Sequence, residues 1–388
     1  MHPLLALICM IGHAVATRPF LDAPDTGIEK ALQIPSNGSL PSLDRLFGLN
    51  DFNYVAERLM NPMIYASVRG GAASEWSYRN NIESFEKLRF RPRVMVNATK
   101  IDASMKTAIL GTLFDAPFFI SPFANAGFAN EEAEAALVGG AGEHGILYIA
   151  SQASTLSMES IVASKQDPKQ VLWQQILLDS DTDVLPVDLF KQIENNNMTA
   201  IVLTVDSTAD RTMYRSRRLI PDPSIERDPR YIFLSWEFYD QLQTLTTLPI
   251  IPKGIQTVED ARKAIDHGAP AIFISNHGGR SLDGAPSALE VAWEIYKKDP
   301  NIFNEIEVYA DGGVRYGSDV LKLLALGVRA VGMGRPFMYA NLYGLKGISR
   351  AISLMKKEIT AAGANLGLQD LKDIDATYIR LVSTQWTD

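Results

Sequence analysis

The chain has 388 residues, of which 46% are hydrophobic, so it can bury one barrel-sized core or two smaller ones. Its formal net charge of -8 argues against nucleic acid as the main partner. The single cysteine, Cys9, lies in an apolar N-terminal run, so a chain cleaved after that run would have neither a disulfide nor thiol chemistry.

The N-terminal run resembles a secretory signal peptide. Residues 3–15 are mostly apolar, and Ala14-Val15-Ala16 forms an A-x-A cleavage site. The run is too short for a membrane span, and the alternative is a buried or frayed N-terminal helix. Three N-glycosylation sequons favour secretion, and they begin at Asn37, Asn97 and Asn197. We therefore predict a signal peptide at 1–16, a mature chain starting near Thr17, and a secreted glycoprotein with no membrane partner.

Residues 17–110 are expected to form an extension that packs on the main domain. Residues 17–45 are rich in Pro, Asp, Ser and Gly, which favours irregular structure. Residues 43–60 carry apolar side chains at helical spacing. We expect this helix to cover one end of the main domain.

From Phe118 onward, short apolar strands alternate with helical stretches. The strands are expected at 118–122, 146–151, 171–177, 200–206, 249–253, 271–276, 307–311 and 330–334. Helices between them are expected at 131–143, 258–267, 285–298 and 317–326, among others. Eight such alternations predict an α/β fold, a TIM (β/α)8 barrel over residues 111–388 with an N-terminal helical extension. The rival fold, a doubly wound sheet, seldom has so even a series.

The longest gap between strands, residues 207–247, holds a cluster of basic residues. The cluster consists of Arg211, Arg215, Arg217 and Arg218. Long excursions at a barrel mouth are usually lids or substrate loops. The cluster is therefore either a solvated loop or a surface that attracts an anionic substrate.

Polar residues recur near the C-terminal ends of the predicted strands, although a barrel fills its centre with apolar side chains. They are Ser151, Gln174, Thr204, Asp206, Lys253, His277, Asp311 and the pair Gly334-Arg335. In TIM barrels this end of the strands carries the ligand. Each residue alone could be structural, but together they predict a binding site at the barrel mouth.

The sixth predicted strand ends in Ser275-Asn276-His277-Gly278-Gly279-Arg280, followed by Ser281-Leu282-Asp283-Gly284. His277 can accept a proton near neutral pH, and Arg280 offers a planar fork suited to a carboxylate. A single histidine after a strand is more often a hydrogen-bonded structural residue. A catalytic role for His277 therefore depends on the sequence motif around it.

Two motifs rich in glycine and arginine follow the seventh and eighth strands, where barrels commonly bind phosphate. They are Asp311-Gly312-Gly313-Val314-Arg315 and Gly332-Met333-Gly334-Arg335-Pro336. Their backbone N–H groups and two guanidinium groups predict a phosphorylated cofactor.

The ten-residue string around His277 closely resembles the active-site signature of the FMN-dependent α-hydroxy-acid oxidases and dehydrogenases. That family includes glycolate oxidase, lactate oxidase and the flavocytochrome-type lactate dehydrogenase. The two motifs after the seventh and eighth strands match its FMN-phosphate motifs, and the resemblance extends from about Trp76 to Gly347. It implies an FMN enzyme without a metal that oxidises a small 2-hydroxy acid or a related activated alcohol. It also implies electron transfer to O2 or an external acceptor, and a homo-oligomer, by resemblance a tetramer.

Residue by residue, the resemblance makes His277 the active-site base, with Asp206 orienting it and Arg280 clamping the substrate carboxylate. It places Lys253 beside the N1–O2 edge of the flavin, where the ammonium would stabilise negative charge on the reduced ring. The isoalloxazine ring would be bound by Ser151, Gln174, Thr204 and the backbone of Ala124. The ribityl phosphate would be held by Asp311, Gly313, Arg315, Gly334 and Arg335.

The substrate side departs from the family pattern. Two tyrosines expected there are missing, with Ser67 in the region of one and Ile176 two residues after Gln174. Met213 stands where a second substrate arginine should be, and we select Arg211, with Arg215 as the alternative, for that role. We therefore expect a substrate pocket that is less polar or differently shaped.

Three functions are open at this point. The first is FMN-dependent oxidation of a 2-hydroxy acid. The second is an FMN-binding barrel with altered or lost hydroxy-acid activity that acts on a bulkier, less polar substrate. The third is a flavin isomerase or another barrel enzyme, against which His277 and Arg280 together argue.

Overall fold

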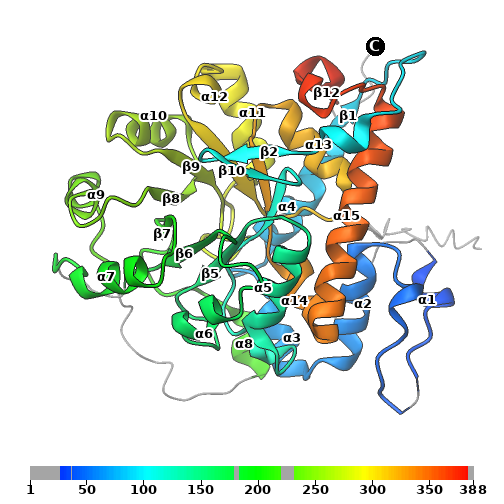
Figure 1. The fold of residues 1–388 in the computed structure, drawn as a ribbon, viewed down its shortest axis with the longest axis horizontal. Coiled ribbons are helices and arrows are strands. Elements are labelled where there is room, and N and C mark those ends of the chain that lie inside the picture. The colour runs from blue at the N-terminus through cyan, green and yellow to red at the C-terminus, as the bar shows by residue number, and fades with distance from the viewer. Residues whose placement is uncertain (1–26, 36, 179–182, 220–230, 383–388) are drawn as a thin grey trace, which may run out of the picture.

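The computed structural model describes residues 27–35, 37–178, 183–219 and 231–382. The signal peptide predicted at 1–16 and the start near Thr17 lie outside the described residues. Figure 1 shows the described chain as one barrel of strands with helices around it.

Eight parallel strands close into a barrel (Figure 1), which confirms the predicted TIM fold. They follow one another around the barrel in chain order: β4 (Phe118–Ile120), β5 (Tyr148–Ser151), β6 (Leu172–Ile176), β7 (Ile201–Thr204), β8 (Ile250–Ile255), β9 (Ala271–Ile274), β10 (Glu307–Asp311) and β11 (Ala330–Met333). Pairing of β11 with β4 closes the ring. Each strand lies within a few residues of its predicted span.

Alternate residues of each strand point into the barrel, because side chains alternate along a strand. The inward positions nearer the base are apolar and include Phe119, Ile149, Trp173, Val202, Ile251, Phe273 and Tyr309. Two residues further along the same strands, the inward positions are Ser121, Ser151, Gln175, Thr204, Lys253, Ser275 and Asp311. The barrel is therefore packed with apolar side chains at its base and polar at its mouth.

Helices cover the outside of the barrel. They are α5 (Ala133–Glu143), α6 (Met158–Ala163), α7 (Val187–Asn195), α8 (Tyr214–Leu219), α9 (Trp236–Gln243), α10 (Val258–Asp266), α11 (Ala288–Lys298), α12 (Ile302–Glu305), α13 (Gly317–Ala325), α14 (Arg335–Ala340) and α15 (Gly344–Leu366). A capping box starts α11, since Ser287 Oγ accepts the Glu290 N–H at 3.2 Å and Glu290 Oε2 accepts the Ser287 N–H at 3.0 Å. The long helix α15 packs along α5 and α13 (Figure 1).

The N-terminal extension contributes elements to both ends of the barrel. Its elements are α1 (Ile28–Ala31), α2 (Leu49–Leu59), α3 (Pro62–Arg69), α4 (Trp76–Lys87), β1 (Leu88–Phe90), β2 (Thr107–Ile109) and β3 (Thr112–Phe114). The β2–β3 hairpin buries Ile109 and Phe114 against the apolar base layer, and the boundary expected at 110/111 falls in its turn. β1 pairs with β12 (Ile379–Leu381), which ties the extension to the end of the barrel domain.

The helix predicted over 43–60 is broken into two pieces. Residues Leu43–Arg45 form a single 3-10 turn, and α2 begins only after Gly48. The Asp51 side chain accepts the N–H groups of Phe47 and Gly48, at 2.6 and 3.2 Å. This local capping starts a new helix, so apolar spacing alone extended the prediction too far towards the N-terminus.

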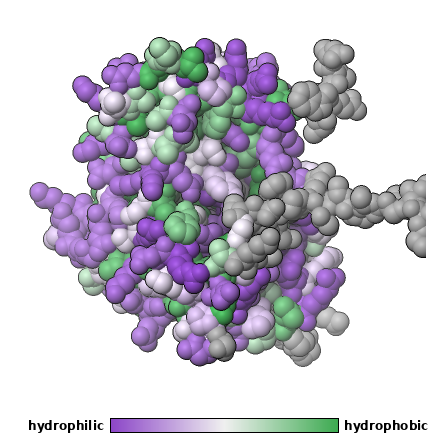
Figure 2. Space-filling view, turned by 90° about the vertical axis from the view of Figure 1, so that its right-hand side faces the viewer, coloured by the Kyte–Doolittle hydropathy of each residue, from purple (hydrophilic) through white to green (hydrophobic). Residues whose placement is uncertain are grey.

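The face of the molecule shown in Figure 2 is largely hydrophilic, and hydrophobic residues are scattered over it. Within the described residues, no helix combines the length and the apolar character needed to cross a membrane. The three sequon asparagines, Asn37, Asn97 and Asn197, are all exposed.

The carboxyl group of Glu358 on α15 should make stability depend on pH. Burial raises its pKa from 4.5 to about 7, and the carboxylates of Asp319 and Asp51 add to the shift. Between these two values the folded chain holds a proton that the unfolded chain releases, so stability should fall as the pH rises through this window.

We expect Glu358→Gln to unfold at a higher urea concentration than wild type at about pH 8, and at a similar concentration at about pH 5. The measurement is the midpoint of urea unfolding at both pH values. Glutamine can still accept the Gly317 N–H, which donates to Glu358 Oε2 at 2.8 Å. An identical pH dependence in the two proteins would contradict the assignment.

Candidate functional site

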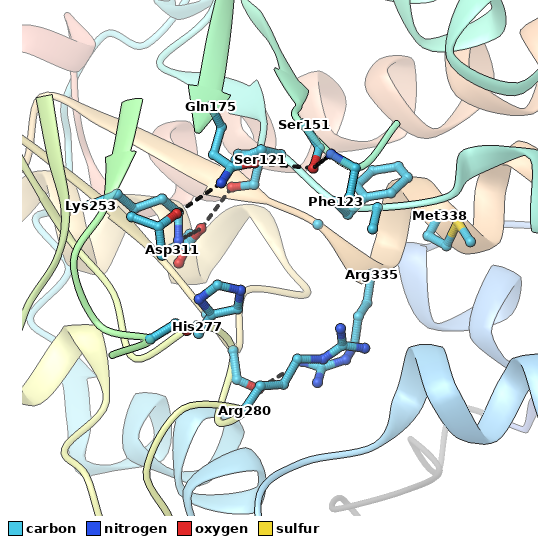
Figure 3. A pocket seen from close by; sticks show the side chains of 18 of the residues that line it. Ser121, Phe123, Ser151, Gln175, Lys253, His277, Arg280, Asp311, Arg335 and Met338 are labelled. Atoms are coloured by element: carbon cyan, nitrogen blue, oxygen red, sulfur yellow. Dashed lines mark hydrogen bonds and ion pairs between the residues drawn. The ribbon is translucent and has the colours of Figure 1, made fainter. Parts of the chain in front are cut away.

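A cavity of about 680 Å³ opens at the mouth of the barrel. Of the predicted site residues it is lined by Ala124, Ser151, Thr204, Arg211, Lys253, His277, Arg280, Asp311, Gly313, Arg315, Gly334 and Arg335. Figure 3 shows His277 between the Lys253–Asp311 pair and the guanidinium groups of Arg280 and Arg335. The fold therefore gathers residues from seven strand ends and their loops around one space.

His277 and Asp206 form a buried pair at this mouth. His277 Nδ1 lies 3.0 Å from Asp206 Oδ1, and the Asp206 side chain is fully buried. Gly254 permits this approach, because a Cβ on it would lie 2.5 Å from Asp206 Cβ. Its φ of 122° also lies in a region that favours glycine. Asp206 thus stands behind the imidazole and fixes the orientation of the ring.

The surroundings favour a neutral His277 beside an ionised Asp206. Burial lowers the pKa of the His277 imidazole to about 4, although the Asp206 charge opposes the shift. Burial would raise the pKa of Asp206, but the hydrogen bond of His277 and the charge of Lys253 bring it below the usual value. Only 24% of the His277 side chain is accessible. At neutral pH the imidazole is therefore unprotonated and can accept a proton.

Lys253 lies at the floor of the cavity in a network of buried polar groups. Its Nζ donates to Ser275 Oγ at 2.7 Å and lies 3.3 Å from Asp311 Oδ2. Asp311 also accepts hydrogen bonds from Ser275 Oγ at 2.6 Å and from Ser121 Oγ at 2.9 Å. Ser275 Oγ further accepts the His277 backbone N–H at 3.0 Å. Ser121 and Ser275 are not among the predicted site residues, although both occupy inward positions by strand alternation.

The prediction for Gln174 is wrong, because its neighbour Gln175 lines the cavity instead. Trp173 points into the barrel, so Gln174 must point outward and Gln175 inward again. Gln175 Oε1 accepts the Ser151 hydroxyl at 3.1 Å, and its Nε2 donates to Thr204 Oγ1 at 2.9 Å. Three adjacent strands thus present a connected polar edge, whereas Gln174 Nε2 donates only to a backbone carbonyl at 2.8 Å.

The same one-residue shift changes the residue that replaces the tyrosine expected two residues after the third-strand glutamine. Ile176 belongs to the outer core between strands and helices, and Leu177 lines the cavity. In the other region Ser67 and Val68 line the cavity. Tyr65 is not among the lining residues, and its hydroxyl donates to Asn53 Oδ1 at 3.2 Å. Neither region therefore places a tyrosine in the cavity wall.

Arg280 and Arg335 are held by backbone carbonyls at the end of α3 and in the loop after β9. Arg280 Nη2 donates to the Ser67 carbonyl at 2.8 Å and also to that of Val68. Arg335 donates to the carbonyls of Val68 at 2.9 Å, Gly278 at 2.8 Å and Gly70 at 2.7 Å. Burial, together with the charge of Arg335, lowers the pKa of Arg280 to about 9. Both groups are thus cations fixed at one side of the cavity.

Of the two candidates for a second substrate arginine, only Arg211 reaches the cavity. Its Nε and Nη2 donate to Ser207 Oγ at 3.2 and 3.0 Å. Arg215, four residues later in α8, points away and binds Glu75. The fold therefore places Arg211, and not Arg215, at the cavity, and its substrate role stays a prediction.

The two glycine-containing motifs form the rim of the cavity that could hold a phosphate. Gly312 and Gly313 have φ values of 106° and 83°, and a Cβ on Gly313 would lie 1.9 Å from the Asn81 carbonyl oxygen. Only glycine fits there, and the chain turns sharply towards the buried Arg315 side chain. A Cβ on Gly334 would meet nothing closer than 4.0 Å, so its backbone faces open space. Bare backbone beside buried cations suits a phosphate group.

Comparisons with known proteins agree with this geometry. A family profile described as FMN-dependent dehydrogenase matches residues 56–230 and 229–381. L-lactate dehydrogenase (cytochrome) of Saccharomyces cerevisiae is 33% identical over 372 residues, covering 88% of this chain and 62% of that protein. Human 2-hydroxyacid oxidase 1 is 32% identical over 373 residues, covering 87% of this chain and 97% of that protein.

A solved structure of the flavin-binding domain of baker's yeast flavocytochrome b2 is also similar. It superposes with a TM-score of 0.82 at 32% identity, covering 88% of each chain. The chain spans less than two thirds of the length of the cytochrome-type relatives that it matches.

Proposed function

Because the chain belongs to the FMN-dependent dehydrogenase family, we propose that it oxidises a 2-hydroxy acid or a related activated alcohol. Electrons would pass to O2 or to an external acceptor. The observation that carries the proposal is the buried His277–Asp206 pair, 3.0 Å apart, at a mouth that also holds the cations Lys253 and Arg280. In this set His277 would accept a proton, Lys253 would stabilise negative charge on the reduced flavin, and Arg280 would bind the substrate carboxylate.

The residues at the mouth fit FMN, the cofactor of the family. We assign the phosphate to Gly313, Arg315, Gly334 and Arg335, and the ring to Ala124, Ser151, Gln175, Thr204 and Lys253. The Asp311 carboxylate, predicted for the phosphate, pairs with Lys253 at the floor instead. The change from Gln174 to Gln175 follows from the inward direction of that side chain. When bound, FMN would accept the two electrons that the substrate loses.

The remaining chemistry belongs to side chains of the chain itself. Asp206 occupies His277 Nδ1, which leaves Nε2 on the opposite edge of the ring to accept a proton from the substrate. The imidazolium that forms is stabilised by the buried Asp206 carboxylate. Arg280 and Arg211 would bind the substrate carboxylate, since the bonds of Arg280 to Ser67 and Val68 use only its Nη2.

A bulkier and less polar substrate than glycolate is a second candidate, favoured by the apolar part of the cavity wall. That part consists of Val68, Leu177, Ile232 and Met338, with the ring of Tyr231 beside them. Apolar walls gain free energy by covering an apolar substituent. Anaerobic mixing of the flavoprotein with 2-hydroxy acids of increasing side-chain size tests this, and fastest flavin bleaching with the smallest acid would contradict it.

The purified protein should carry one FMN per chain. The reason is the combination of the buried Lys253, the glycine turn at Gly313 and the open backbone at Gly334. The measurement is the absorption spectrum after mild purification, with the flavin identified after release. A colourless protein that gains no flavin absorption on addition of FMN would refute the cofactor assignment.

We also propose that the chain enters the secretory pathway, loses residues 1–16 and is glycosylated. The proposal is supported by the apolar N-terminal run, the A-x-A site and the exposure of Asn37, Asn97 and Asn197. Native material should begin near Thr17 and lose mass when N-glycans are removed enzymatically. An intact Met1 or His2 on native protein would refute cleavage.

A tetramer, the state implied by resemblance, would be seen by light scattering.

A further inference from the structure

Two buried asparagines, Asn81 and Asn276, form a reciprocal amide pair beside His277. Asn81 Nδ2 donates to Asn276 Oδ1 at 2.8 Å, and Asn276 Nδ2 donates to Asn81 Oδ1, also at 2.8 Å. Asn276 immediately precedes His277, whereas Asn81 lies on α4 of the N-terminal extension. Each asparagine is only 1% exposed, so neither amide can exchange its partner for bulk water without a rearrangement.

The other contacts of Asn276 fix the orientation of its amide. Its Oδ1 also accepts the Gly279 N–H at 2.9 Å, and its Nδ2 also donates to the Pro286 carbonyl at 2.9 Å. Both N–H groups of Nδ2 and both lone pairs of Oδ1 are therefore used. Turning the amide over would place its NH2 group against the Gly279 N–H and its oxygen against the Pro286 carbonyl. Only one orientation therefore satisfies all of its partners.

The turn after Asn276 has a backbone that a histidine seldom adopts. His277, Gly278 and Gly279 have φ values of 60°, 65° and 77°, all in the left-handed region. Glycine tolerates this region, but at His277 it is unfavourable and persists only where surrounding contacts hold it. Among the residues that the structure describes, the Gly279 N–H donates to Asn276 alone, to Oδ1 at 2.9 Å and to the backbone carbonyl at 3.0 Å. The Asn276 side chain therefore closes the turn that carries His277.

Other contacts hold the carbonyls, the first N–H and the imidazole of this turn. They are His277 N–H to Ser275 Oγ at 3.0 Å, Arg335 Nη1 to the Gly278 carbonyl at 2.8 Å, Ala72 N–H to the Gly279 carbonyl at 2.8 Å, and His277 Nδ1 with Asp206 Oδ1 at 3.0 Å. None of these binds the N–H that closes the turn. Loss of the amide pair should therefore tilt the imidazole and leave the turn in its place.

We propose that Asn81 is a positioning residue: through Asn276 it holds the left-handed turn in the shape that directs the His277 imidazole at the substrate. The inference rests on the proposed function, because it takes His277 as the proton acceptor. Without the Asn81 amide, a donor and an acceptor of Asn276 are left unsatisfied in a buried site, which favours rotation of that amide away from the Gly279 N–H. A catalytic group displaced by about 1 Å can lose roughly 10²-fold in rate.

The neighbouring binding groups do not depend on the Asn81 side chain. A Cβ on Gly313 would lie 1.9 Å from the Asn81 carbonyl oxygen, so the phosphate turn packs on the main chain of α4, which a side-chain substitution leaves in place. Arg280 is bound by the carbonyls of Ser67 and Val68 at the end of α3. A change of the Asn81 side chain should therefore spare both FMN binding and carboxylate binding.

The test compares Asn81→Ala with wild type as full-length, FMN-loaded protein. Rapid mixing with a hydroxy acid that wild type oxidises gives the rate of flavin reduction at saturating substrate. The change in flavin absorption gives the dissociation constant of oxalate, a carboxylate without an oxidisable C–H bond. We expect reduction to slow roughly tenfold, with FMN content and oxalate affinity changed by less than about twofold. Asn276→Ala should slow reduction at least as much, and the double variant should be no slower than Asn276→Ala.

A second readout does not depend on substrate or flavin. Hydrogen–deuterium exchange, followed by mass spectrometry, should be faster in Asn81→Ala than in wild type for the peptide that contains Gly279. If Asn81→Ala does not accumulate as folded protein, Asn81→Ser takes its place, because it removes the same amide with a smaller loss of volume. The matched control on the same helix is Asn80→Ala. Asn80 is 5% exposed, and its Nδ2 donates to Glu290 Oε2 at 2.6 Å, so its loss should change neither flavin reduction nor exchange at the turn.

Unchanged flavin reduction in Asn81→Ala overturns the inference. Slower reduction without faster exchange at the turn also overturns it, as does an equal loss of oxalate affinity, because the effect would then not arise from the direction of His277. A double variant slower than Asn276→Ala would show that Asn81 acts by another route. A wild-type protein that carries FMN but is reduced by no 2-hydroxy acid refutes the proposed function. That result is read from wild type alone, and the inference falls with it.

Discussion

Replacing His277 with alanine should slow reduction of the bound flavin by substrate by roughly 10²–10⁴-fold, the usual contribution of a positioned acid or base. The imidazole is held 3.0 Å from Asp206, so its loss removes the proton acceptor. FMN content should stay near that of wild type, because the phosphate motifs follow β10 and β11 whereas His277 follows β9. Rapid mixing with a hydroxy acid that wild type oxidises, after flavin content has been determined, gives the rate.

Arg280→Lys is the informative comparison for that variant. Lysine keeps the positive charge but loses the planar fork, so it should chiefly raise KM and leave the reduction rate at saturating substrate less affected. If His277→Ala bleached its flavin as fast as wild type, His277 would be structural. The proposed oxidation would then lack its proton acceptor.

The strands and the polar residues at their C-terminal ends could be predicted from the sequence. They follow from the repeated alternation of strands with helices and from the alternation of side chains along each strand. Apolar strands of three to six residues, separated by helical stretches, repeat eight times. The family string around His277 then selected the residues of the mouth. The direction of each side chain was not worked out along the strands, and the prediction failed at Gln174, which points outward from β6 while Gln175 points inward. The inward Trp173 and the polar Gln175 share one face, a signal that strand alternation could have revealed.

The contacts that set the substrate side could not be predicted in the same way. Glu75 and Arg215 are separated by 140 positions and meet only because the excursion after β7 folds back onto the extension. No local spacing encodes that meeting, and the sequence left Arg211 and Arg215 as alternatives. In the structure their side chains point in different directions: Arg211 lines the cavity, whereas Arg215 binds Glu75 outside it. Long-range ion pairs of this kind depend on tertiary packing rather than on pattern.

Lys253→Met should weaken both folding and FMN binding, because it removes a buried cation from the floor of the cavity. Lys253 is 4% exposed, and its Nζ lies 3.3 Å from Asp311 Oδ2. Breaking a buried pair from one side typically costs roughly 3–5 kcal/mol, since the remaining charge loses its counter-ion. We expect less than that here, because Ser121 and Ser275 still donate to Asp311.

Two further variants separate charge from packing in this prediction. In Lys253→Met/Asp311→Asn no uncompensated charge is left, so much of the lost stability should return, as measured by thermal unfolding of the FMN-free protein. FMN affinity should stay low, because the cation for the flavin edge is still missing. Lys298→Met, which removes a pair with Glu294 on the exposed face of α11, should leave the unfolding temperature almost unchanged. If Lys253→Met alone unfolded at the wild-type temperature and bound FMN as tightly, Lys253 could be neither the counter-ion of Asp311 nor the cation at the flavin.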